Sequence, residues 1–268
     1  MLKVKKYLFV IFLLIISEIS DLNCSLSLPG SINDNKYIIS VGYTTERKSV
    51  KINSNSTDLI VLDINGTIFK YFDRTYKDYN IDILSNYTFL SFSIKPFYKI
   101  WYNASFDLIG AQTGKLGDKN FLSSLTYGYG GNLSLFYNLF PQTIVTPAII
   151  AKVNVEVREY RFDSFFDNNY IKYKVESNIF INDSSFGLYG VRTIAKQFLE
   201  VYVGSDIIYR SSSLNDITSS LSVSGSETFL KFYLNNKFYI TKNEKLEIYF
   251  EYTTKKEYTF SIAYEIGW

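Results

Sequence analysis

Large apolar residues and polar residues alternate at every second position along most of the chain from about residue 37 onward. In residues 148–158 the odd-numbered positions are all apolar, whereas the three charged residues, Lys152, Glu156 and Arg158, fall on the opposite face. A period of two indicates a β-strand, because successive side chains of a strand point to opposite faces. Several segments are longer than the roughly five or six residues of a common strand in a soluble protein. The pattern therefore predicts an all-β chain with unusually long strands.

The pattern predicts ten strands separated by clusters of polar turn residues. Their predicted ranges are 37–47, 79–94, 98–110, 122–139, 144–160, 170–182, 198–211, 227–240, 245–253 and 257–268. Short connections after the second, fourth and eighth strands contrast with longer polar loops on the other side. Residues 183–197 are too long for a short turn, so we expect the sixth strand to be longer and bulged.

Residues 59–72, between the first two predicted strands, predict a separate element. Two short apolar runs flank Asn65-Gly66, a dipeptide that favours the tight turn of a β-hairpin. We predict a hairpin that extends the first outer loop. Two alternatives stay open: the hairpin folds into the lumen, or it adds a strand pair and makes twelve strands.

The C-terminal residues carry the most specific pattern. Tyr264, Ile266 and Trp268 share one face of the last strand, and the chain ends on Trp268. This end resembles the closing strand of bacterial outer-membrane β-barrels. Over about residues 37–268 the chain resembles the small, single-domain outer-membrane β-barrel proteins of Gram-negative bacteria. The resemblance implies an antiparallel transmembrane up-and-down β-barrel of about ten strands in the bacterial outer membrane. It also implies that the barrel-assembly machinery reads Tyr264, Ile266 and Trp268 during insertion.

The N-terminal region predicts export. Residues 1–24 resemble a secretory signal peptide, with a basic start at Lys3, Lys5 and Lys6 before a short apolar stretch. We expect a signal peptide at 1–24, a short periplasmic leader at 25–36 and the barrel domain at 37–268. Cys24 is the only cysteine, so no disulfide within the chain is possible. The cleavage site and the lipidation of Cys24 stay open.

Composition narrows the function. The chain holds 24 Tyr and 22 Phe, no His, and a net charge of +2 that does not favour nucleic acid as a partner. Without His, neither a His-ligated metal site nor a Ser-His-Asp triad can form. Outer-membrane phospholipases, omptin-type proteases and His-dependent lipid A deacylases rely on a catalytic His, and the chain departs from them. We therefore predict no enzyme activity, no catalytic residues, no metal site and no cofactor.

Charged residues on the polar faces of the strands are predicted to line the lumen. These candidate residues are Asp107, Lys152, Glu156, Arg158, Glu200, Asp206, Arg210, Lys231, Lys237, Glu247, Glu251 and Glu265. They could guide small solutes, or they could form ion pairs that close the interior, which is the expectation we favour for so few strands.

The predicted function is a structural or surface role in the outer membrane, with a narrow passive pore as a variant. The alternatives are a small-solute porin with a conducting lumen, a His-independent lipid-modifying enzyme, and a secreted soluble β-sandwich. The expected partners are outer-membrane lipids and the assembly machinery. We expect a monomer and leave an oligomer open.

Overall fold

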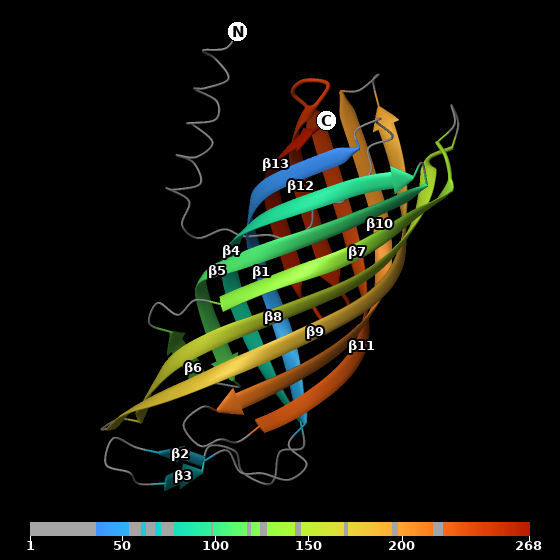
Figure 1. Cartoon of the computed structure of the whole chain (residues 1–268). Coiled ribbons are helices and arrows are strands. Elements are labelled where there is room, and N and C mark those ends of the chain that lie inside the picture. Colours follow the sequence, from blue (N-terminus) through green and yellow to red (C-terminus); the bar gives the residue numbers. More distant parts are fainter. Residues whose placement is uncertain are drawn as a thin grey trace, which may run out of the picture.

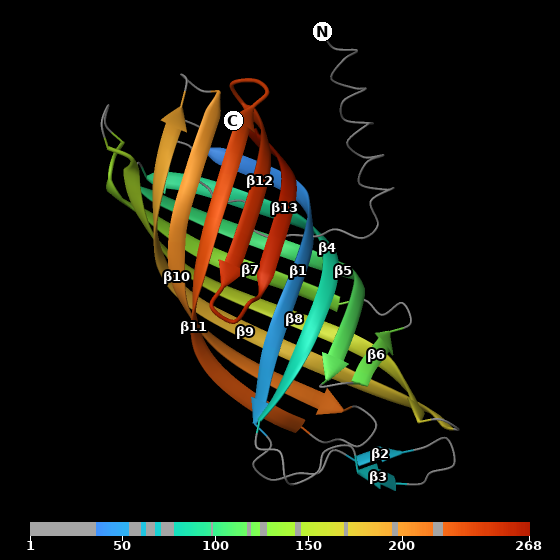
Figure 2. The same cartoon turned by 180° about the vertical axis from the view of Figure 1, so that it is seen from behind.

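Ten long strands form a closed antiparallel barrel in the computed structural model (Figures 1 and 2). The structure describes residues 36–53, 60–62, 68–70, 78–97, 99–116, 119–123, 128–142, 146–168, 171–194, 198–216 and 222–268. The ten strands are β1 (Tyr37–Asn53), β4 (Asp78–Phe97), β5 (Ile100–Leu116), β7 (Gly128–Phe140), β8 (Ala148–Asn168), β9 (Ile171–Ile194), β10 (Leu199–Asp216), β11 (Ser222–Tyr239), β12 (Glu244–Thr253) and β13 (Tyr258–Gly267). Each pairs with the next, and β1 pairs with β13 to close the ring. The predicted ten-strand barrel is therefore confirmed, and the alternative of twelve is wrong.

Three short strands lie outside this ring order. β2 (Ile60–Leu62) and β3 (Ile68–Lys70) pair with each other in a separate two-stranded sheet, at the end of the barrel opposite the C-terminus (Figure 1). This pairing agrees with the predicted hairpin, whose Asn65-Gly66 turn lies outside the described residues. β6 (Lys119–Ser123) pairs with β5 and β8. The prediction of one strand over 122–139 was wrong, because β6 and β7 are two elements.

The sixth long strand, β9, runs through the segment that did not fit a short turn. It continues to Ile194 with an unbroken register against both β8 and β10. The expected lengthening is confirmed, whereas the expected bulge is wrong. Register shifts occur instead in the β4–β5 and β7–β8 pairs.

Both ends of the barrel wall meet at one rim. The amide nitrogens of Lys36 and Tyr37 donate to the main-chain oxygen of Trp268, at 2.9 and 3.0 Å. With an even number of antiparallel strands, the first strand begins and the last strand ends at the same rim. In bacterial barrels this is the periplasmic rim. The predicted signal peptide at 1–24 and residues 25–35 of the predicted leader lie outside the described residues.

The outer wall carries a belt of exposed apolar side chains. Leu133 is 67% exposed, Val203 58% and Phe232 49%. Aromatic residues mark the edges of the belt: Tyr129, Tyr209 and Tyr252 toward the outer end, and Tyr37, Tyr137, Phe198 and Trp268 toward the periplasmic end. Such a belt suits lipid and not water. The alternative of a soluble sandwich is wrong, because its apolar faces would pack inward. No helix among the described residues is long and apolar enough to cross a membrane.

Beyond the belt the wall rises unevenly. β8 and β9 have 21 and 24 residues, whereas β12 and β13 have 10 each. Above the short β12–β13 hairpin, β1 pairs directly with β11 at Asn53 and Ser224. The ring therefore bypasses two strands there. We call this upper part the extension.

The extension has an apolar inside and a polar outside. Its inward side chains include six that are at most 4% exposed: Val50, Ile81, Ile83, Ile179, Ile181 and Leu214. Its outer face includes Arg47, which donates a 2.8 Å hydrogen bond to Asp82. This hydrogen bond raises the pKa of the Arg47 guanidinium. The extension is thus closed by an ordinary hydrophobic core.

Candidate functional site: the charged interior

Within the membrane belt, the inward faces of the strands carry three clusters of charged residues. The periplasmic cluster consists of Glu200, Lys237, Lys245, Glu247 and Glu265. The central cluster consists of Lys152, Asp206, Lys231 and Glu251. The outer cluster consists of Glu46, Lys48, Asp107, Glu156, Arg158, Asp183, Arg210, Glu227, Lys255 and Glu257. Each of these residues has an opposite charge within 4.0 Å.

The periplasmic cluster joins strands β10 to β13. Lys237 Nζ lies 2.5 Å from Glu265 Oε2 and 3.7 Å from Glu247 Oε2. Lys245 Nζ lies 3.3 Å from Glu200 and 3.4 Å from Glu265. All five side chains are at most 2% exposed. Pairing compensates for the desolvation of these charges, which would be very unfavourable for any of them alone.

The central cluster spans the lumen between strands that are not neighbours. Lys152 on β8 donates a 2.9 Å hydrogen bond to Asp206 on β10, and neither side chain is exposed. Lys231 lies 3.7 Å from Asp206 and 3.4 Å from Glu251. Gly187 on the intervening β9 leaves room, since a β-carbon there would lie 1.8 Å from Asp206 Oδ1. The missing side chain of Gly187 therefore allows this pair to form.

Tyrosine rings fill the lumen beside these two clusters. The four rings are Tyr189, Tyr202, Tyr233 and Tyr249, each at most 3% exposed. Tyr189 lies 6.1 Å from Tyr202 and 6.2 Å from Tyr233, measured between ring centroids. Lys152 Nζ lies 5.3 Å from the Tyr233 centroid, within the range of a cation–π contact. The rings, the ion pairs and buried apolar residues such as Trp101, Phe136 and Ile150 together occupy the interior.

Arg158 organises the inner part of the outer cluster. Its guanidinium pairs with Glu46, with Glu156 at 2.9 Å and with Asp107 at 3.5 Å. Lys48 donates a 2.7 Å hydrogen bond to Glu156 across the lumen. Five side chains from β1, β5 and β8 are joined in this way.

Arg210 organises the part nearest the extension. It donates two 2.8 Å hydrogen bonds to Asp183 and two to Glu257, of 2.5 and 3.3 Å. Lys255 pairs with Glu227 at 2.5 Å. Because Lys255 and Glu257 belong to the β12–β13 turn, this short hairpin is tied to the inside of the wall.

The twelve candidate residues from the sequence all lie on the inward side of the wall. Eleven are at most 6% exposed and Glu251 is half-buried: Asp107, Lys152, Glu156, Arg158, Glu200, Asp206, Arg210, Lys231, Lys237, Glu247, Glu251 and Glu265. The structure pairs each of them with an opposite charge, which alternation alone could not specify. Their functional role stays a prediction.

Sequence reasoning missed several members of the clusters. Glu46 and Lys48 occupy even-numbered positions of β1, which are the inward positions of that strand, so the alternation could have found them. Lys245 shares the parity of Glu247. Asp183 was missed because its segment was treated as a connection.

The chain is similar to solved structures of outer-membrane proteins. No family model matches the chain, and no curated protein matches its sequence. The outer membrane protease OmpT from Escherichia coli matches over 91% of this chain and 99% of its own, with a TM-score of 0.53 and 10% identity. The beta domain of the Bordetella autotransporter BrkA covers 88% of this chain and 100% of its own, with a TM-score of 0.41 and 10% identity. The attachment invasion locus protein Ail of Yersinia pestis covers 88% and 98%, with a TM-score of 0.33 and 9% identity.

The chain has the outer-membrane β-barrel fold. The apolar belt supplies the physical reason, because its side chains require lipid around the wall. The protein therefore resides in the bacterial outer membrane, as the sequence predicted.

The prediction that the chain is not an enzyme was wrong as a general exclusion. It relied on the lack of His to separate the chain from barrel enzymes, yet a protease has the fold that matches at a TM-score of 0.53. At 10% identity this likeness shows the fold alone, and it decides enzyme activity neither way. Among the described residues, no three His, Cys, Asp or Glu side chains are grouped so that they could hold a metal ion.

Proposed function

We propose that this protein is a closed surface protein, whose barrel anchors the extension at the cell surface and does not conduct solutes. The observation that carries the proposal is the pairing of buried charges across the lumen. Lys48 on β1 reaches Glu156 on β8, and Lys152 on β8 reaches Asp206 on β10. These contacts run through the space that a solute would need.

Conduction requires a continuous path whose lining groups a passing ion can reach. Lys152 and Asp206 are fully buried against each other and against the tyrosine rings, so neither is available to an ion. The size of the barrel supports the same conclusion. Barrels of about eight strands are just filled by side chains, whereas wide aqueous channels need 16 or more.

The extension supports the surface role. Buried apolar side chains such as Val50, Ile81 and Ile181 lie inside its wall, and polar side chains such as Asn182 lie on its outer face. A barrel that only anchored itself would need no such projection. The extension therefore offers a rigid surface to the outside.

Conductance in a planar lipid bilayer tests whether the barrel is closed. The folded protein, checked by its heat-modifiable mobility on a denaturing gel, should insert without a stable conductance step. A general porin inserted under the same conditions provides the positive control. Reproducible, ion-selective steps from the wild-type protein would favour the small-solute porin instead.

Cysteine labelling of intact cells tests the surface role. In a Cys24→Ser background, Asn182→Cys on the extension should react with a membrane-impermeant maleimide. Asn243→Cys in the β11–β12 turn, which is also exposed, should react only after the cells are broken. The opposite labelling pattern would place the extension in the periplasm and end the surface proposal.

A further inference from the structure

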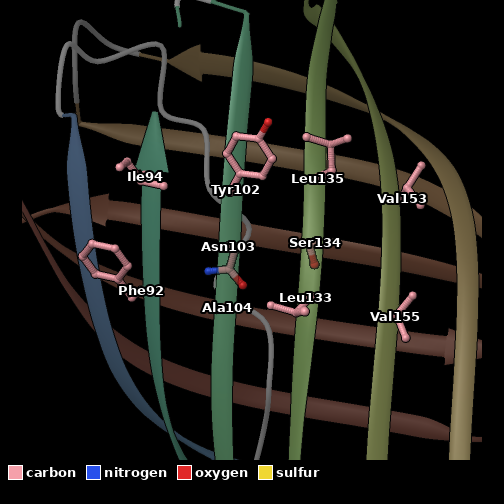
Figure 3. Close-up of a pocket in the computed structure, with 10 residues that line it drawn as sticks. All are labelled: Phe92, Ile94, Tyr102, Asn103, Ala104, Leu133, Ser134, Leu135, Val153 and Val155. Atoms are coloured by element: carbon pink, nitrogen blue, oxygen red, sulfur yellow. The ribbon is translucent and has the colours of Figure 1, made fainter. Parts of the chain in front are cut away.

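The lipid-facing wall contains a groove across four neighbouring strands. Its volume is about 310 Å³, and outward side chains of β4, β5, β7 and β8 surround it (Figure 3). Ala104 is the small residue at its centre, and its register partners on either side are Phe92 and Leu133. Along β5 the larger Tyr102 and Phe106 flank Ala104. The groove thus results from one small side chain within a row of large ones.

The groove is apolar along its length and opens on the membrane belt. Phe92 is 43% exposed and Leu133 67% exposed. Figure 3 shows Ile94, Tyr102 and Leu135 at the end of the groove toward which β4 runs, which is the periplasmic end. An acyl chain lying along the wall would contact apolar atoms on three sides.

Exposed lysines lie just beyond that periplasmic end. Lys36 Nζ lies 5.5 Å from the centroid of the Tyr37 ring, and Tyr37 stacks on Phe92 of the groove wall at 6.3 Å. The backbone nitrogen of Lys95 donates to the carbonyl of Lys36 at 2.9 Å, which holds Lys36 beside the end of β4. Lys99 is exposed in the β4–β5 turn, three residues before Tyr102.

The charge of this rim is one-sided among the described residues. The positively charged side chains outside the lumen there are Lys36, Lys99, Arg192 and Lys242. Outside the lumen, Glu244 is the one acidic side chain that the described residues place at this rim. Lysines at this depth attract anionic headgroups, because their flexible stems reach the membrane surface.

We propose that the groove binds an anionic phospholipid of the periplasmic leaflet, with an acyl chain against Ala104 and the phosphate near Lys36 and Lys99. The two features fit one molecule, because a phospholipid joins an apolar chain to an anionic head. Tyr102 lies between them and suits the interface, since its ring is apolar and its hydroxyl polar. A neutral lipid would satisfy the groove and leave the lysines without a counter-charge.

Native mass spectrometry of the full-length protein, released from detergent after incubation with phosphatidylglycerol or phosphatidylcholine, tests this site. The wild-type protein should retain one phosphatidylglycerol in preference to phosphatidylcholine. Ala104→Phe should abolish that preference by filling the groove, whereas Val203→Phe on the lipid face of β10 should not. Both variants must show the heat-modifiable mobility of the folded barrel.

A second set of variants tests the two lysines, with a lysine elsewhere at the rim as the control. Lys36→Gln and Lys99→Gln should each weaken retention of phosphatidylglycerol about fivefold, the effect expected for one lysine at a membrane surface. Lys242→Gln, on an exposed turn elsewhere at the rim, should leave retention unchanged. Equal binding of the two lipids by all variants would reduce the groove to ordinary lipid contact and overturn the proposal. A dimer that Ala104→Phe disrupts would instead show that a second copy of the chain fills the groove, which also overturns it.

Discussion

The membrane-spanning part of the barrel and its extension use the same strands with opposite distributions of polarity. Within the belt, Val203 points outward at 58% exposure, and Asp206 on the same strand is buried inside. Farther along this strand, Leu214 is the buried residue, while Ser211 is exposed on the outer face. The hydrogen-bond ladder between β9 and β10 runs through both parts without a shift.

The difference shows that the backbone hydrogen bonds between two strands form equally well whichever face of the strands is apolar. The surroundings of the wall decide which face is apolar. Lipid surrounds the belt, so apolar side chains point outward there and polar ones point inward. Water surrounds the extension, so polar side chains point outward there and apolar ones point inward. The two interiors then need different solutions. In a hydrophobic core the side chains need only fit together in shape, whereas in a charged interior every charge needs an opposite charge beside it.

The largest expected effect comes from breaking a charge cluster in the belt. Arg158→Met removes the partner of three buried carboxylates, those of Glu46, Asp107 and Glu156. We expect a loss of about 3–5 kcal/mol in the free energy of unfolding, because the buried Asp107 loses its partner and Lys48 alone remains beside Glu46 and Glu156. Urea unfolding in lipid vesicles measures it, and adding Glu46→Gln should recover part of the loss. An unchanged unfolding midpoint would mean that the charged interior does not stabilise the barrel.

The core of the extension should be less sensitive than that cluster. Ile181→Ala truncates a side chain that is 1% exposed and whose register partner on the neighbouring β8 is Arg158. We expect a loss of about 3 kcal/mol, the usual result of a cavity in a packed core. The same truncation on the lipid face, Leu90→Ala, should cost much less, since lipid fills the space. Equal losses in the two variants would contradict the contrast between the two parts.

A charge on the lipid face should have a somewhat smaller effect. Val203→Arg places a guanidinium midway along the belt, between Phe198 and Tyr209. We expect a loss of about 2 kcal/mol, at the low end for such positions, because the long arginine side chain can reach the interface. Asn182→Arg on the outer face of the extension is the matched control and should leave the unfolding midpoint within error. A similar loss at both sites would place the extension in lipid.

The smallest effect is expected for an arginine outside the lumen on β8. Arg161 is 41% exposed and donates a 2.9 Å hydrogen bond to Glu159, which raises the pKa of the Arg161 guanidinium. Arg161→Met should lower the free energy of unfolding much less than Arg158→Met, because solvent screens the Arg161 charge and Glu159 keeps a 3.0 Å hydrogen bond from Asn178. Comparing it with Arg158→Met, three residues away on the same strand, isolates the effect of burial. A loss as large as that of Arg158→Met would show that charge, and not burial, decides.

The sequence by itself determined which residues share a face. A period of two needs only local geometry, so alternation in 148–158 correctly grouped Lys152, Glu156 and Arg158. The same pattern along the chain predicted ten strands, and the resemblance to outer-membrane barrels implied that they close into a barrel. The same local signal could also have found Glu46 and Lys48. It could not separate β6 from β7, because both fit one alternating run.

Only the tertiary structure decided which charges meet and where the polarity reverses. Lys48 and Glu156 are 108 residues apart in the chain, and their contact depends on the closure and register of the whole ring. The pairing of β1 with β11 above the β12–β13 hairpin likewise depends on the relative heights of four strands. Alternation states that a residue points in or out of the wall, whereas the partner across the lumen is set by the curvature and stagger of all ten strands.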